Sequence, residues 1–164
     1  MGFVCQGRYA LAPIEPTDAE KYVNLQLDCM EQTYDPIYFD ALGESFTARH
    51  RAERNEYLED FHRHLSSPTV RGFFAYEVPG WTPDGGLSCS IGARIDWDKP
   101  VGLALSLCEP SSWELERAES LPELPAGTRK LAHLYTLNHT HGTGLGQALY
   151  ESVIYPDENS YLWV

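Results

Sequence analysis

The sequence is poor in basic residues. Its 164 residues contain 12 Lys and Arg against 24 Asp and Glu, which gives a formal net charge of −12. Nucleic-acid binding needs clustered cations that neutralise phosphates, so this balance argues against a nucleic-acid partner. A negative field raises the local concentration of cations, so the same balance is compatible with a cationic amine as a partner.

Long apolar runs and paired cysteines are missing as well. No stretch approaches the ~20 apolar residues of a membrane span, and residues 1–12 lack the basic start and apolar core of a secretion signal. We therefore expect a cytoplasmic protein with no membrane partner. Cys5, Cys29, Cys89 and Cys108 form no CxxC pair, which argues against a structural zinc site or a disulfide framework.

The length predicts one domain that spans residues 1–164. A capping box at Thr17 and Glu20 opens a predicted helix, and that helix should end near Pro36, because a residue that precedes proline avoids the helical region. The other patterns predict strands at 8–14, 70–78, 101–107 and 131–137, an irregular strand or hairpin at 87–97, helices at 47–65 and 145–154, and a polar loop with a short helix at 109–127.

One stretch near the end joins a strand, a glycine-rich turn and a helix. Residues 131–137 have the apolar content of a buried strand, residues 139–144 are rich in turn formers, and residues 145–154 carry an apolar helical stripe. The first amides of a helix lack intrahelical partners, and the helix dipole adds positive charge there. Glycines at 142, 144 and 146 would let a pyrophosphate reach those amides. The alternative is an ordinary connection whose glycines only permit close packing.

Two common nucleotide motifs do not fit this stretch. No lysine follows the glycines, as a P-loop requires, and Gln147 stands where a dinucleotide fingerprint has its third glycine. Such a fingerprint also needs an acidic residue about 20 positions further on and a second βαβ unit. The sequence ends at residue 164, before either could follow.

Residues 136–149 instead resemble the signature of the GNAT superfamily of acyl-CoA-dependent N-acetyltransferases, V-x-P-x-x-[RQ]-G-x-G-[IL]-G-x-A-L between a strand and a helix. The departures are Thr136 for valine, Asn138 for proline and His141 for Arg or Gln. The resemblance implies an α/β (α+β) fold with a mixed, mostly antiparallel central sheet flanked by helices. Residues 160–164 resemble the start of the family's fifth strand, so the family's C-terminal part would be missing.

The resemblance also implies the reaction, a direct transfer of an acetyl group from acetyl-CoA, without a metal, to a primary amine of a small molecule or peptide. Backbone groups of Tyr135, Thr136 and Leu137 would pair with the pantetheine arm. The pyrophosphate would meet His141 and the amides of Gly142, Thr143, Gly144, Leu145, Gly146 and Gln147. A different class of function is a GNAT-like module that binds acyl-CoA without turnover and acts by interaction.

Candidate catalytic residues are His133 and Tyr135, which alternate onto one face of the strand. An unperturbed histidine has a pKa near neutrality, which suits His133 as a general base; the alternative is a histidine used for packing. Lys130 stands near the point where the family often has a glutamate. His133, His139 and His141 are too scattered in strand and turn to predict a metal site.

Two further expectations concern the acceptor and assembly. Glu31 and Tyr34, at the end of the first helix, lie where the acceptor pocket of the family usually opens, and Glu31 could attract an ammonium group; it could equally be a solvated helix residue. A sheet cut at its fifth strand would leave an open apolar edge, which favours pairing with another chain. The sequence therefore predicts a homo-oligomer joined through residues 160–164.

Overall fold

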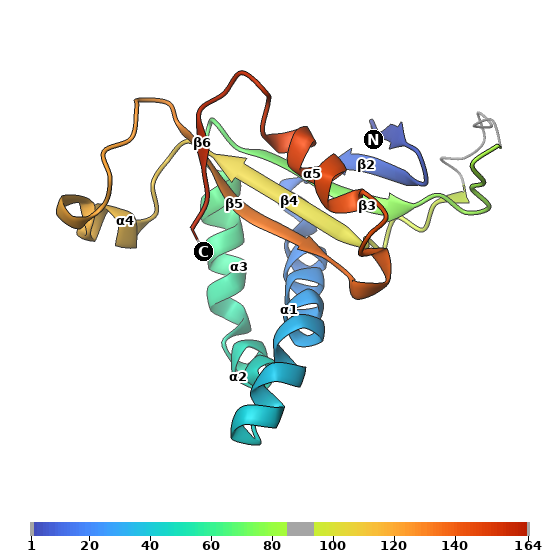
Figure 1. Cartoon of the computed structure of the whole chain (residues 1–164), viewed down its shortest axis with the longest axis horizontal. Helices are drawn as coiled ribbons and strands as arrows, with labels where there is room; N and C mark the ends of the chain where they lie inside the picture. Colours follow the sequence, from blue (N-terminus) through green and yellow to red (C-terminus); the bar gives the residue numbers. More distant parts are fainter. Residues whose placement is uncertain (1, 85–93, 164) are drawn as a thin grey trace.

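The computed structural model describes residues 2–84 and 94–163; the strand or hairpin predicted at 87–97 falls largely outside them. A six-stranded sheet in the order β1-β2-β3-β4-β5-β6 forms the centre (Figure 1). Its strands are β1 (Val4–Gln6), β2 (Tyr9–Pro13), β3 (Arg71–Glu77), β4 (Gly102–Leu107), β5 (Arg129–Thr136) and β6 (Ser160–Tyr161). Neighbouring strands are antiparallel except β5 and β6, which are parallel. The mixed, mostly antiparallel sheet predicted from the sequence is confirmed.

Helices cover both faces of this sheet (Figure 1). One face carries α1 (Ala19–Leu42), α2 (Phe46–Ala52) and α3 (Arg54–Leu65), and the other carries α5 (Leu145–Val153). The short α4 (Ser112–Glu116) projects on the loop that leads from β4 to the start of β5 (Figure 1), and the described residues also contain the 3-10 turns η1 (Pro16–Asp18), η3 (Ala118–Ser120) and η4 (Asn138–Thr140). Within residues 2–84 and 94–163, no helix combines the length and the apolar character needed to cross a membrane.

The core lies on both sides of β4, as its apolar sequence predicts. All six residues of β4 are buried, because successive side chains point to opposite faces and each face is covered. Toward α1 and α3 the core contains Tyr22, Leu27, Phe61, Phe74, Leu103 and Leu105. Toward α5 it contains Leu11, Ala75, Ala104, Leu145, Leu149 and Val153.

The first helix runs six residues past Pro36, so the predicted end near that proline is wrong. A proline inside a helix removes one backbone bond, and here the carbonyl left over is that of Gln32, four residues earlier. That oxygen lies 3.4 Å from the side-chain amide nitrogen of Asn138, whose backbone N–H in turn donates to the Gln32 side chain at 2.8 Å. Contacts with the glycine-rich turn therefore compensate for the proline.

Two boundaries near the other helices also differ from the prediction. The helix expected at 47–65 is divided into α2 and α3 at Glu53, whose backbone leaves the helical region. The reciprocal cap expected from Thr17 and Glu20 is formed two residues earlier, by Glu15 and Asp18 around η1. A capping pattern fixes spacing but not position, because several polar residues here satisfy it.

An arginine–glutamate pair fixes the segment that leads from α5 to β6. Arg71 donates two hydrogen bonds to Glu158, at 2.6 and 2.7 Å, and its guanidinium lies 3.9 Å from the ring centre of Tyr155. The Arg71 bonds are the main reason why the pKa of Glu158 is lowered to about 2. We expect Glu158→Gln to lower the melting temperature by a few degrees in a thermal scan, because a neutral amide loses the bidentate geometry. Asp157→Asn, at an exposed neighbour, should not change it and serves as the control.

Candidate functional site

Two glycines shape the turn between β5 and α5. Gly142 and Gly144 have φ angles of +74° and +85°, in the left-handed region that side chains rarely adopt, and Gly144 is the residue that precedes the first turn of α5. Gly146 lies inside α5 and needs no special backbone angle. The presence of glycine at position 146 therefore requires another explanation.

Open space surrounds all three glycines. A Cβ atom built on Gly142, Gly144 or Gly146 would have no atom within 4 Å, whereas one on Gly102 would lie 2.9 Å from Leu149. Close packing thus explains Gly102 but does not explain Gly146, and the packing alternative fails for this turn. Glycine in a helix costs about 1 kcal/mol relative to alanine, so a ligand that approaches this position is the simplest reason for it.

The backbone amides at this open turn lack partners. Within the described residues, the N–H groups of Gly144, Leu145, Gly146 and Gln147 make no hydrogen bond, and no side chain caps α5. Together with the helix dipole they form a positively polarised surface. Such a surface accepts an anion as large as a pyrophosphate.

Hydroxyl groups hold the turn in this shape. Buried Thr140 donates from its side chain to the carbonyl of Leu137 at 2.7 Å, and Thr143 donates to the carbonyl of Thr140 at 2.5 Å. The Thr143 hydroxyl also meets the Tyr9 hydroxyl of β2 at 2.8 Å. With the Asn138 contacts to α1, these bonds tie the turn to both layers, so the amides are fixed before any ligand binds.

Among the residues that the structure describes, none pairs with the outer edge of β5 from Leu131 onward. β6 pairs only with Arg129 and Lys130, and the chain then leaves the sheet. Between Leu105 and Ser106 of β4 the register with β5 shifts, which marks a bulge at residues 131–133 of β5. The open edge of six residues, about 20 Å of strand, leads directly to the glycine turn.

The edge determines which backbone groups an added strand could reach. The N–H of Leu137 donates to the carbonyl of Val101 at 3.0 Å, so Leu137 faces β4. Because directions alternate along a strand, Tyr135 also faces β4, while Thr136 and Leu134 face the open edge. Of the three residues predicted to pair with the pantetheine arm, Thr136 turns its backbone groups toward the open edge, and so does Leu134, which the prediction did not include.

His133 and Tyr135 point toward α1 and α3, as their spacing predicted, but the environment of His133 is not that of a base. Nδ1 of His133 lies 2.6 Å from the hydroxyl oxygen of Tyr22. Burial, with smaller contributions from His64 and Lys130, lowers the pKa of His133 to about 3. Burial also raises the pKa of Tyr135, and a bond with Gln26 opposes that rise. A titration of His133 near neutrality, expected from the sequence, is therefore not supported.

The other predicted side chains have partners elsewhere, although Tyr34 lies near enough to Tyr135 to help raise the pKa of that residue. Glu31 pairs with Arg51 at 2.5 Å, and Tyr34 packs on Phe46 with a ring-centre distance of 5.1 Å. His139 lies 3.3 Å from Glu77 and His141 lies 3.4 Å from the carbonyl of Thr136. Within residues 2–84 and 94–163, no cluster of three or more His, Cys, Asp or Glu suited to a metal ion occurs.

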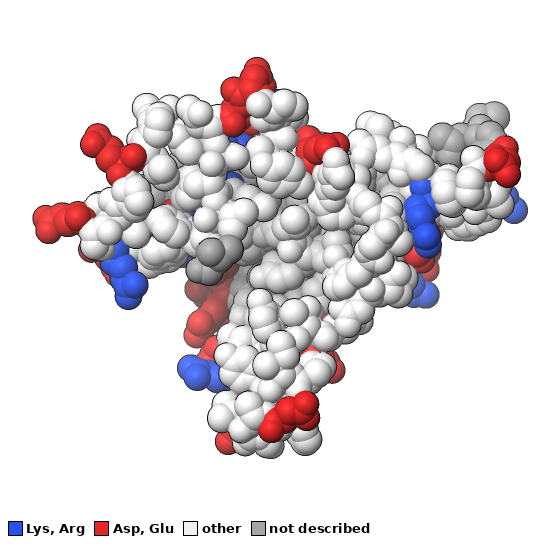
Figure 2. Space-filling view, viewed as in Figure 1, with Lys and Arg blue, Asp and Glu red and all other residues white. Residues whose placement is uncertain are grey.

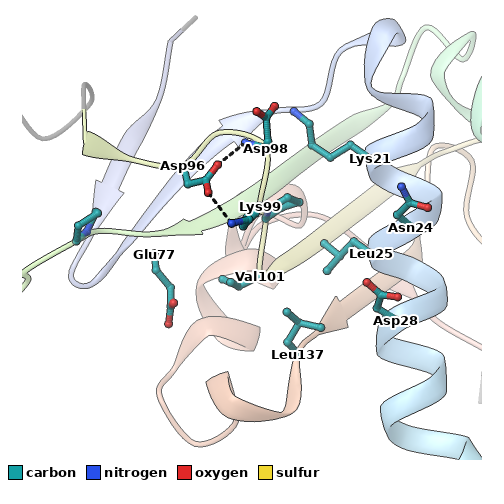
Figure 3. A pocket seen from close by; sticks show the side chains of 12 residues that line it. Lys21, Asn24, Leu25, Asp28, Glu77, Asp96, Asp98, Lys99, Val101 and Leu137 are labelled. Atoms are coloured by element: carbon teal, nitrogen blue, oxygen red, sulfur yellow. Dashed lines mark hydrogen bonds and ion pairs between the residues drawn. The ribbon is translucent and has the colours of Figure 1, made fainter.

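A cavity of about 800 Å³ lies at the turn end of the sheet, between α1 and the start of β4 (Figure 3). Leu25, Val101 and Leu137 supply its apolar wall. Four carboxylates and two amines supply its polar wall: Asp28, Glu77, Asp96, Asp98, Lys21 and Lys99. Most of these charges are paired within the chain, for example Asp96 with Lys99 at 3.2 Å and Asp28 with Arg51 at 2.9 Å.

A second cavity, of about 760 Å³, lies at the other end of β5. Its wall includes His64, His133, Ala132, Leu131, Trp113 and Trp163. In Figure 2 the surface is hollowed between the sheet and the arm formed by the end of α1 and α2, and that hollow is lined mostly by uncharged residues. The wall of the second cavity also includes the charged residues Asp60, Arg63, Glu109 and Lys130, so the open edge of β5 has polar groups at both of its ends.

Sequence reasoning missed several residues that line this second cavity or contact its wall. Tyr22 and His64 are ordinary members of their helices in the sequence, and only the fold brings them to His133. Glu114 carries a sequence signal, because Ser111 and Glu114 have the spacing of a capping box, which the structure contains. Its second partner, Lys130, at 2.5 Å, could not be read from that pattern.

Comparisons with known proteins agree with this architecture at the level of the fold. Neither a protein-family model nor a curated protein matches the sequence. The solved structures include aminoglycoside N-acetyltransferase AAC(6')-Iy in complex with CoA, with a TM-score of 0.51, 11% identity, and coverage of 100% of this chain and 79% of that chain. AAC(6')-Ih from Acinetobacter baumannii gives a TM-score of 0.50, 9% identity, and coverage of 95% and 79%.

A third structure, AAC(6')-Iy with the bisubstrate analogue CoA-S-monomethyl-acetylneamine, gives a TM-score of 0.50, 12% identity, and coverage of 95% and 79%. At such low identity the likeness concerns the path of the backbone alone. The chain therefore has the fold of the GNAT acetyltransferases.

Proposed function

We propose that the chain binds acetyl-CoA and transfers its acetyl group to a primary amine of a small molecule or peptide. The observation that carries this proposal is the continuity of two features: an open glycine turn with unpartnered amides, and the unpaired edge of β5 that begins beside it. The first suits a pyrophosphate and the second suits an extended amide-containing arm.

Residue roles follow from the geometry of the turn. The amides of Gly144, Leu145, Gly146 and Gln147 would hold the pyrophosphate, and Gly142 keeps the approach open. The amide of Thr143 is less available, because it donates to the carbonyl of Thr140 at 3.3 Å. His141 would meet the same ligand from the side, and Thr136 with Leu134 would pair with the arm.

Calorimetry with CoA and acetyl-CoA, followed by an assay of thiol release with a panel of amines, tests the proposal. We expect both nucleotides to bind in the micromolar range, and thiol release that depends on an amine. The panel should contain an aminoglycoside, a polyamine, an arylalkylamine and a peptide with a free N-terminus. Absence of binding by both nucleotides would contradict the whole proposal.

A second candidate is an acyl-CoA-binding module without turnover. One observation favours it: burial holds the pKa of His133 at about 3, so this residue is a poor acceptor for the proton of an ammonium group. Binding of acetyl-CoA without thiol release for any amine in the panel would support this module over the enzyme.

The oligomeric state predicted from the sequence stays a prediction. Tyr161 and Trp163 turn back onto Glu114, with bonds of 2.7 and 2.8 Å; Tyr161 is partly buried there, while Leu162 and Trp163 remain exposed. Light scattering at tens of micromolar, repeated with Leu162→Ser, is the direct measurement. A monomer before and after the substitution would contradict the predicted association through residues 160–164.

A further inference from the structure

The second cavity contains an imidazole whose hydrogen-bonding direction can be assigned. Tyr22 is only 1% exposed, and its hydroxyl has no hydrogen-bond partner other than Nδ1 of His133 among the described residues. If the hydroxyl accepted a hydrogen bond from an Nδ1–H group, its own proton would be buried without an acceptor, which is unfavourable. The hydroxyl of Tyr22 therefore donates, and Nδ1 of His133 accepts.

The proton of the neutral His133 ring then resides on Nε2. Tyr22, His64, Tyr135 and Lys130 are the titratable groups that face this ring, from α1, α3 and β5. None of them is an anion that would favour a charged imidazole: burial raises the pKa of both tyrosines and lowers that of His64 to about 4. The ring stays neutral at physiological pH, with Nε2–H as its only donor.

That donor is reachable from the cavity. Nε2 has no hydrogen-bond partner in residues 2–84 and 94–163, and it is not among the buried unpaired atoms. His133 also lies beside the bulge where the edge of β5 opens. From Thr136, next to the glycine turn, to His133 is about 10 Å along the strand. A pantetheine arm that binds along the open edge of β5, starting from the glycine turn, therefore extends toward His133.

We propose that this cavity is the binding site of the acyl carbonyl, and that His133 donates its Nε2–H to the carbonyl oxygen while Tyr22 acts as the positioning residue that fixes the tautomer. The inference rests on the proposed function and assigns His133 the opposite role from a base. In the transfer, the amine nitrogen forms a bond to the carbonyl carbon, the carbon–sulfur bond breaks, and the thiolate leaves with the electron pair. The proton lost by the amine ends on the thiol or in solvent, so His133 neither gains nor loses one.

A neutral donor suits this step for an electrostatic reason. Negative charge develops on the carbonyl oxygen as the nitrogen attacks, and a donor that is already fixed next to the oxygen stabilises that charge. Loss of one such donor lowers turnover by about a hundredfold or more. Neutral imidazole needs no reorganisation, because Tyr22 holds it in place before the acyl group arrives.

Nuclear magnetic resonance of ¹⁵N-histidine-labelled protein tests the assignment without reference to turnover. We expect His133 as the Nε2–H tautomer from pH 5 to pH 9, and a downfield shift of that proton with acetyl-CoA but not with CoA. An Nδ1–H tautomer, or a charged ring near pH 6, would overturn the proposal. If both nucleotides bind and neither moves the proton, the carbonyl site is wrong although the proposed function stands. If neither binds, the proposed function itself fails.

Substitutions distinguish a hydrogen-bond donor role of His133 from a packing role. His133→Gln keeps an N–H donor near the position of Nε2 and should retain turnover within about tenfold, whereas His133→Ala should lose about a hundredfold, with little change in the affinity for CoA. Tyr22→Phe should convert the single tautomer into a mixture while the protein stays folded. Equal activity of Ala and Gln variants would overturn the donor role. The tautomer measurement on the unchanged protein remains decisive if a variant does not fold.

Discussion

Gly146→Glu is expected to abolish CoA binding without destabilising the protein. Its Cβ has open space, its backbone is helical, and it lies in the first turn of α5. A carboxylate there is favourable for the helix dipole but occupies the proposed pyrophosphate site with bulk and negative charge. We expect the dissociation constant for CoA to rise by about a hundredfold or more, since loss of charge-assisted bonds and like-charge repulsion act together.

Two measurements make this result specific. Thermal unfolding should show a melting temperature equal to or above that of the unchanged protein, because glycine is a poor helix residue. Gly146→Ala controls for the loss of glycine: it should raise the melting temperature and weaken CoA binding much less. A Gly146→Glu protein that binds CoA normally would show that the turn is not the phosphate site. Gly144 is a weaker choice, because its φ of +85° makes any side chain there strained.

The sequence predicted the glycine turn well because its signal is local. Strand, turn and helix follow one another directly, and the positive φ values of Gly142 and Gly144 are what such a turn needs. The mixed, mostly antiparallel sheet was predicted from the family resemblance, and the buried β4 from an apolar run that has no polar face. For the glycine turn and for β4, the residues that determine the local structure are neighbours in the sequence.

The role of His133 could not be predicted in the same way. Its pKa depends on burial under α1 and α3 and, to a smaller extent, on His64 and Lys130. Tyr22 and His64, which contact its ring, are far from it in the sequence. Likewise, Pro36 was expected to end α1, because nothing in the sequence shows that Asn138 meets the carbonyl it leaves free. Tertiary contacts overrode local preference at both positions.

A buried ion pair gives the second large expected effect. Lys130 of β5 and Glu114 of α4 are 4% and 6% exposed and lie 2.5 Å apart. Glu114 also accepts bonds from the backbone N–H of Ser111, the Tyr161 hydroxyl and the Trp163 indole, at 2.5, 2.7 and 2.8 Å. This one carboxylate therefore joins α4 and β6 to the start of β5, beside the second cavity.

Removal of one partner should be costly. Glu114→Gln leaves the Lys130 ammonium buried without a counter-charge, and such changes cost about 3–5 kcal/mol of unfolding free energy. Urea unfolding measures this loss. The double variant Glu114→Gln with Lys130→Met should recover part of it, because the buried charge is gone while the amide oxygen still accepts from the remaining donors. Arg49→Gln is the control, since its ion pair with Glu53 involves a side chain that is 81% exposed and should contribute less than about 1 kcal/mol.

The same carboxylate predicts how stability depends on pH. Despite burial, which acts in the opposite direction, the bonds from Lys130 and its other donors lower the pKa of Glu114 from 4.5 to about 2. A group whose pKa is lower in the folded state stabilises the protein above its ordinary pKa, and that contribution disappears as the pH falls toward the folded value. The difference in unfolding free energy between the unchanged protein and Glu114→Gln should therefore be constant above about pH 5 and shrink by on the order of 3 kcal/mol toward pH 2. Trp113 and Trp163 pack together beside this carboxylate, so tryptophan fluorescence can be used to follow unfolding at each pH. A difference that does not change with pH would show that Glu114 is not ionised in the folded protein.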